Sequence, residues 1–138
     1  MSVSRIIPSM LIAITACTTA CSHSDKQGKP KAQSSPIEIV DEAYSHLLKG
    51  EYTDYLLCTQ SADSLPQEYR QNLVNVLKQA AENEKEARGG MVRAKATSEE
   101  RNEADTYALV RVDVVYGDST KEEIAVQTVR LGGRWRLK

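Results

Sequence analysis

The fold of this chain is decided by residues 106–137, which read TYALVRVDVVYGDSTKEEIAVQTVRLGGRWRL. Every second residue from Ala108 to Tyr116 is apolar, and Arg111 and Asp113 lie between them. Because side chains alternate between the two faces of a strand, this spacing predicts a β-strand with one buried face. The valines in the run also suit a pleated sheet, since β-branched side chains are stiff.

A second strand follows residues 117–119, the turn-forming triplet Gly-Asp-Ser. Its apolar residues change phase, because Ile124 and Val126 share one face whereas Val129 and Leu131 share the other. A change of phase inside one strand predicts a bulge, a bend or apolar contact on both faces.

A short closing strand is predicted to complete the sheet. Gly132 and Gly133 indicate a two-residue hairpin turn, because glycine takes positive φ without steric cost. Beyond this turn, Trp135 and Leu137 should point inward. Trp135 is the only tryptophan of a chain that has no phenylalanine, and we expect it to fill the core.

Residues 36–49 are predicted to form the first helix. Ser35 can cap this helix, Pro36 suits its first position, and Glu38 would complete a capping box. Apolar residues then recur at helical spacing and stop before a glycine. His46 lies off this apolar stripe, so we expect it at the surface.

Two further helices and a strand follow. Residues 51–59 indicate a short connecting helix, and a second capping-box-like start at residues 64–67 precedes a longer helix that should stop at Gly89-Gly90. Residues 91–98 read as the first strand, with Val92 pointing inward. The expected buried stripe of the longer helix comprises Tyr69, Leu73, Val76, Leu77 and Ala80.

This order of elements predicts a single α+β domain at residues 35–138. Consecutive strands joined by short turns favour an antiparallel sheet. We therefore expect N-terminal helices packed on an antiparallel sheet of about four strands. The net charge of −1 shows no basic excess, which argues against nucleic acid as a partner.

The N-terminus predicts export and lipid attachment. Residues 1–16 indicate a lipoprotein signal peptide, whose apolar core is too short to span a bilayer. Residues 14–17, Ile-Thr-Ala-Cys, resemble a bacterial lipobox, and the resemblance implies cleavage before Cys17 and acylation of its sulfur. Cys21 is the alternative, with a signal peptide of residues 1–20.

A lipidated cysteine would anchor the protein to the inner or outer membrane of a bacterial cell envelope, with the domain in the periplasm or at the cell surface. Each buried methylene contributes about 0.8 kcal/mol, so two or three acyl chains give almost permanent attachment. Residues 17–34 are polar and predict a flexible linker. An ordinary signal peptide with incidental cysteines is the alternative.

The predicted domain carries few side chains suited to catalysis. Cys58 is its one cysteine, so an internal disulfide is excluded, and no histidine lies near it in the sequence. The spacing shows no metal-ligand cluster, no Gly-rich phosphate loop and no Gly-x-Ser-x-Gly elbow. We therefore predict no catalytic residue, no metal and no cofactor.

Four features resemble small bacterial lipoproteins that carry the domain of unknown function 4878. They are the Ser35-Pro36 helix start, Gly-Glu-Tyr at residues 50–52, the Gly89-Gly90 break, and Gly-Arg-Trp-Arg-Leu at residues 133–137. That family is similar to the nuclear-transport-factor-2-like, or cystatin-like, superfamily. The resemblance implies a cone-like fold with a curved sheet wrapped around helices, and in many relatives a pocket opens between helix and sheet.

The first functional hypothesis is a non-catalytic envelope lipoprotein that binds a small apolar ligand or a protein partner. Its candidate pocket-lining residues are Tyr44, Tyr55, Tyr107 and Trp135.

Two other hypotheses stay open. An isomerase-like or dehydratase-like enzyme would need a buried base such as Asp54 or Asp113 and a tyrosine donor opposite it, but the pattern places neither aspartate inside a pocket. A structural module could instead form a homodimer through the open face of the sheet.

Overall fold

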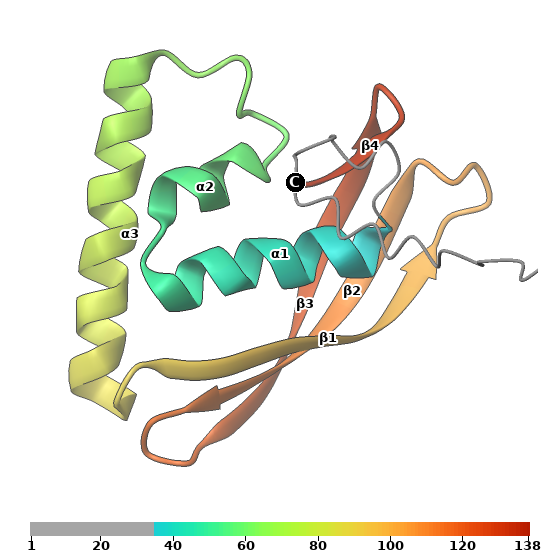
Figure 1. Ribbon diagram of the computed structural model, residues 1–138. Coiled ribbons are helices and arrows are strands. Elements are labelled where there is room, and N and C mark those ends of the chain that lie inside the picture. The colour runs from blue at the N-terminus through green and yellow to red at the C-terminus, as the bar shows by residue number, and fades with distance from the viewer. Residues whose placement is uncertain (1–34) are drawn as a thin grey trace, which may run out of the picture.

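The computed structural model describes residues 35–138, so the predicted signal peptide, both candidate lipidation cysteines and the linker lie outside the described residues. The described chain forms three helices followed by a four-stranded antiparallel sheet with strand order β1-β2-β3-β4. Figure 1 shows a curled sheet with α1 lying across it. The predicted α+β class with a curved antiparallel sheet is confirmed.

Helix α1 (Pro36–Lys49) begins with the predicted capping box. The Ser35 side chain accepts a hydrogen bond from the Glu38 amide, and the Glu38 carboxylate accepts one from the Ser35 amide, both at 3.1 Å. Val40 and Ala43 are fully buried against the sheet. These caps satisfy amides that have no partner inside the helix, and they fix where α1 starts over β1.

Helices α2 (Tyr52–Leu57) and α3 (Gln67–Arg88) follow. The predicted second capping box is wrong, because α3 begins after Pro66 without a side-chain cap. Ser64 lies too early in the chain to reach the first amides of α3, and its hydroxyl donates to the Ser61 carbonyl instead.

The strands are β1 (Met91–Arg101), β2 (Tyr107–Tyr116), β3 (Lys121–Leu131) and β4 (Arg134–Leu137). The inward valines of β2, Val110, Val112 and Val114, are 0% exposed and Trp135 is 4% exposed. The predicted core is therefore confirmed at its centre. Apolar burial of this kind is the main favourable term in folding.

Strand β3 keeps one phase along its length. It pairs with β2 without a register shift, and Thr128 continues the inward face of Ile124 and Val126. Thr128 is fully buried, and its hydroxyl is satisfied there because it donates to the Ala108 carbonyl at 2.9 Å. The sequence left a bulge, a bend or apolar contact on both faces as alternatives for this strand. The unshifted pairing excludes the bulge. Val129 is half-buried on the other face.

The bulges occur in β1 instead, where the pairing with β2 shifts between Met91 and Arg93 and again between Ala96 and Ser98. The first irregularity turns Val92 outward, so its predicted inward position is wrong, and the side chain is 57% exposed. The strand also continues to Arg101, beyond the predicted residue 98.

Helix α3 stands beside α1 and α2 rather than across the sheet, and only its last turn lies next to the start of β1 (Figure 1). Its predicted buried stripe is wrong in part. Val74 is the buried residue of α3, whereas Tyr69 is 54% exposed and Val76 is 62% exposed. The inward side of α3 is displaced by roughly one residue relative to the prediction, and Arg70 lies on that side, where its guanidinium donates to the Ala62 carbonyl at 2.7 Å.

Candidate functional site

The chemically richest cluster of the described chain surrounds His46 on α1. Glu42 and His46 are four residues apart in the helix, so both project from one side. Gly50 ends α1 in the left-handed conformation with φ of 74°, and the chain turns back toward His46. This reversal places Glu51, and then Asp54 on α2, beside the imidazole.

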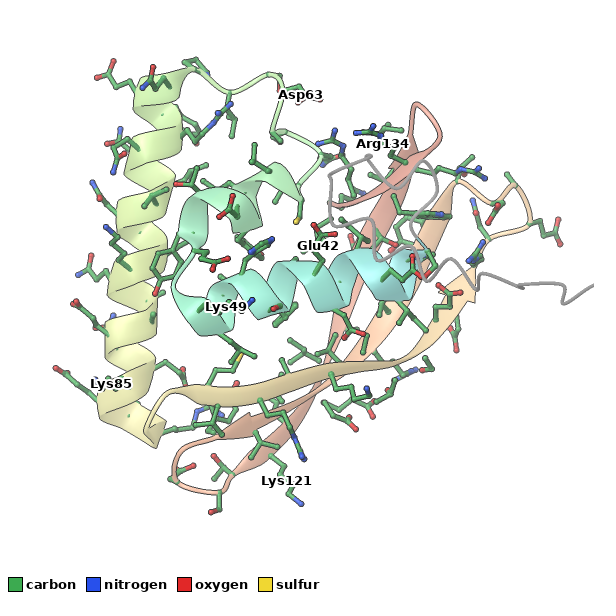
Figure 2. All side chains as sticks on the ribbon, viewed as in Figure 1. Glu42, Lys49, Asp63, Lys85, Lys121 and Arg134 are labelled. Carbon is green, nitrogen blue, oxygen red and sulfur yellow. The ribbon has the colours of Figure 1, made fainter. Side chains whose placement is uncertain are left out.

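Both nitrogens of the imidazole face carboxylates. The Nδ1 atom of His46 lies 2.6 Å from Oε2 of Glu51, and the Nε2 atom lies 3.9 Å from Oε1 of Glu42. His46 is the more shielded partner, with a side chain 23% exposed against 60% for Glu42 and 41% for Glu51. Figure 2 shows Glu42 leaving α1 on the side that faces α2.

Cys58 completes the cluster from the end of α2. Its thiol is buried beside the Glu42 and His46 side chains and donates to the Asp54 carbonyl at 3.5 Å. The backbone holds it from the other side, because the Leu137 amide donates to the Cys58 carbonyl at 2.9 Å. The chain after α2 thereby runs along β4, and Thr59 pairs with Leu137 as an isolated bridge.

The environment of Cys58 disfavours a thiolate. Burial, together with the nearby carboxylates of Glu42 and Asp54, raises the pKa of the Cys58 thiol to about 11, although Arg136 opposes this effect. Reactive cysteines have the opposite shift. A thiol that stays protonated at neutral pH is a poor nucleophile, so the cysteine and histidine do not form an activated pair.

This cluster was missed by the sequence analysis, which expected His46 at the surface and found no histidine near Cys58. The two residues are twelve positions apart and meet because α1 and α2 pack as a helical hairpin. A local signal was present, since Glu42 precedes His46 by one helical turn and Glu51 follows directly after the Gly50 turn.

Three of the four candidate pocket-lining residues, Tyr44, Tyr55 and Trp135, belong to or pack against one core cluster, whereas Tyr107 does not. Tyr44 and Tyr55 approach each other between α1 and α2, where burial first and the neighbouring phenol second raise the pKa of Tyr44 to about 12. Burial likewise raises the pKa of Tyr55. Trp135 is buried in the core on the inner face of the sheet. Tyr107 pairs with Val129 on the outer face, near Lys138.

The two aspartates considered as catalytic bases are both exposed. Asp113 lies on the outer face of β2 opposite Glu123, and Asp54 lies in the first turn of α2, near the His46 imidazole and Glu51. Neither is enclosed beside a tyrosine, which is the arrangement that isomerase or dehydratase chemistry requires.

A second candidate site is the exposed edge of α3, which we call the α3 seam. Its residues recur with alternating spacings of four and three, the heptad pattern of helices that pair. All but the half-buried Leu73 are exposed. The seam comprises Tyr69, Leu73, Val76, Ala80, Asn83 and Ala87.

No protein-family model and no curated protein matches this chain. Among solved structures, the chain is similar to an NTF2-like protein of Campylobacter jejuni that is provisionally described as a transpeptidase. The match has a TM-score of 0.58 and 15% sequence identity, and covers 75% of this chain and 97% of the other. The described domain therefore has an NTF2-like fold, as the resemblance to that superfamily implied, while the domain of unknown function 4878 stays a prediction.

Within residues 35–138, no helix is both long enough and apolar enough to cross a membrane.

Proposed function

We propose that this chain is a lipid-tethered, non-catalytic interaction module of the bacterial envelope, and that its α3 seam binds the α3 seam of a second copy. The observation that carries this proposal is the exposure of Tyr69 and Val76, at 54% and 62%, on a helix of 22 residues. Exposed apolar side chains arranged in a row are typical of interaction surfaces.

The seam has a self-complementary distribution of sizes. Its large residues, Tyr69, Leu73 and Val76, occupy the N-terminal half, and small or polar residues occupy the C-terminal half. In an antiparallel pair related by a two-fold axis, two of the three large residues face an alanine. Tyr69 would face Ala87, and Val76 would face Ala80.

The remaining pair of the same register sets Leu73 opposite Asn83. A single polar residue in an otherwise apolar helical seam specifies register at some expense of stability. A parallel pair would instead stack large residues on each other and leave the C-terminal half thinly packed. Size complementarity therefore favours an antiparallel second copy over other occupants.

The tether supports this proposal through local concentration. Lipobox-like residues before Cys17, with Cys21 as the alternative, are followed by a polar stretch up to residue 34. Chains confined to one membrane meet far more often than chains in free solution, so a seam of modest affinity is sufficient.

Site-specific photocrosslinking in the membranes of producing cells tests the seam. The full chain carries benzoylphenylalanine in place of Val76, and a matched chain carries it in place of Val92, which is similarly exposed, at 57% against 62%, but lies on β1. We expect a product of twice the protein mass from position 76 and none from position 92. Equal products at both positions, no product, or a product that contains another protein would contradict the second copy.

A charge substitution gives an independent test. Val76→Glu would bury an unpaired carboxylate in the paired seam, at a cost of about 1–3 kcal/mol, which is roughly 5- to 150-fold in affinity. Val92→Glu should leave association unchanged. Sedimentation equilibrium of both variants in detergent micelles distinguishes these outcomes.

Native mass spectrometry of the protein extracted from its own membrane tests the tether. The expected mature chain starts at Cys17 or Cys21 and carries acyl groups. An unmodified chain that starts at Ser22 or later would contradict lipid anchoring and leave the α3 result unaffected.

A further inference from the structure

We propose that Glu42, His46 and Cys58 form a binding site for a divalent transition metal, with zinc as the best-matched ion. One ligand atom from each of the three side chains lies within 4.8 Å of the other two. Zinc–ligand distances of about 2.0–2.3 Å place tetrahedral ligand atoms roughly 3.3–3.8 Å apart. Small side-chain rotations therefore bring the three atoms to zinc-binding separations.

The imidazole is already oriented for a metal at Nε2. Its Nδ1 atom lies 2.6 Å from Oε2 of Glu51, so the tautomer that donates from Nδ1 to this carboxylate has an Nε2 lone pair free for a metal on the side of Glu42. A carboxylate behind a histidine is the usual outer partner of a metal-bound imidazole. Glu51 therefore acts as a positioning residue, whereas Glu42 supplies an oxygen ligand.

The donor set selects the metal. Sulfur, nitrogen and one carboxylate oxygen suit zinc and its neighbours in the first transition row, and they do not suit calcium or magnesium, which take oxygen ligands. Three protein ligands also leave a fourth position for water or a substrate group, on the side where Glu42 is 60% exposed.

The local charge favours a cation. Glu42 and Glu51 pair with His46, and within residues 35–138 neither carboxylate forms a salt bridge with a lysine or arginine. Arg136, whose guanidinium donates to the Leu57 and Thr59 carbonyls on either side of Cys58, forms an ion pair with Asp63 at 3.3 Å. Metal binding would displace the Cys58 thiol proton to solvent and join the end of α2 to the middle of α1.

Cobalt(II) titration of the full chain carrying Cys17→Ser and Cys21→Ser tests this site, because Cys58 is then the single thiol. Absorption spectroscopy in detergent micelles should show a thiolate-to-cobalt charge-transfer band and the intense visible bands of four-coordinate cobalt, saturating at one ion per chain. Zinc should displace the cobalt and abolish both features.

Variants separate the roles of the residues. In the same background, Cys58→Ser should abolish the charge-transfer band, and Glu51→Gln should weaken cobalt binding by about 10–100-fold while keeping the band. Glu86→Gln, an exposed carboxylate of α3, is the matched control and should bind like the parent. Circular dichroism shows whether each variant is folded.

Three results would overturn the proposal. They are the lack of a charge-transfer band at a stoichiometric cobalt concentration, an unchanged band in Cys58→Ser, and equal affinity in Glu51→Gln and Glu86→Gln. Because Glu51 is half exposed and outside the core, its variant remains informative even if replacing Cys58 prevents folding.

Discussion

Gly117 lies so close to Gly89 that a Cβ atom added to Gly117 would be 2.5 Å from the Gly89 carbonyl oxygen. The Gly117 amide donates to the Gly90 carbonyl at 2.8 Å, and the Asp118 amide donates to the Arg88 carbonyl at 2.9 Å. The turn between β2 and β3 is thereby attached to the end of α3. Together with Arg88, which stacks over the Tyr116 ring and pairs with Glu122 at 3.3 Å, this contact joins the end of α3 to the sheet.

Gly117→Ala should lower the free energy of unfolding by about 1–3 kcal/mol, because the methyl group overpacks a backbone that cannot move aside locally. Amide hydrogen exchange should accelerate at residues 117 and 118. Gly132→Ala is the control, since nothing lies within 4 Å of its Cβ position, and it should leave those two amides protected. Unchanged stability and protection in Gly117→Ala would show that the two backbones are farther apart.

Asp41 joins α1 to β1 through a hydrogen bond from the Ala96 amide to its Oδ1 atom at 2.8 Å. Asp41→Ala leaves this amide without its partner next to a bulge and should cost about 1–3 kcal/mol in urea unfolding. Asp41→Asn keeps an oxygen at the same position and should retain most of the stability. Equal losses in the two variants would mean that the charge, rather than the acceptor, is responsible.

The two serine motifs that look alike in the sequence should behave differently. Ser35→Ala removes the oxygen that accepts a hydrogen bond from the Glu38 amide at the start of α1 and should cost about 1 kcal/mol in thermal or urea unfolding. Ser64→Ala affects an exposed turn outside any helix cap and should have a smaller effect. A larger loss in Ser64→Ala than in Ser35→Ala would contradict the assigned start of α3.

Alkaline pH should destabilise the fold through Tyr44. In the unfolded chain this phenol has a pKa of 10.0, whereas burial in the folded chain raises the pKa to about 12. The folded state therefore binds more protons between these values, and the free energy of unfolding falls as the pH rises from 10 to 12. Below pH 10 the protonated Tyr44 phenol makes its full contribution to the free energy of unfolding.

Tyr44→Phe should flatten this decline. Urea unfolding at a series of pH values between 9 and 12 measures the slope. Identical slopes in the parent and in Tyr44→Phe would show that the Tyr44 phenol is not protected from solvent.

The local sequence pattern was sufficient to predict the helices, the strands and the residues at the centre of the core. Alternation alone identified β2, because a strand with one buried face must place every second side chain inward. Glycines at residues 50, 89, 132 and 133 marked the ends of helices and the last hairpin, since each takes positive φ. The predicted capping box at Ser35 was correct because both of its partners lie within one helical turn.

The rest depended on how the elements pack. Whether an apolar helix face is buried depends on where its neighbours stand, so Val76 remains exposed despite a helical stripe that predicts burial. Whether His46 meets Cys58 depends on the turn at Gly50, which brings two helices together at an angle that composition does not encode. Spacing along the chain reports neighbours within a turn or a strand, whereas a site assembled from α1, α2 and the edge of β4 exists only once the chain has folded.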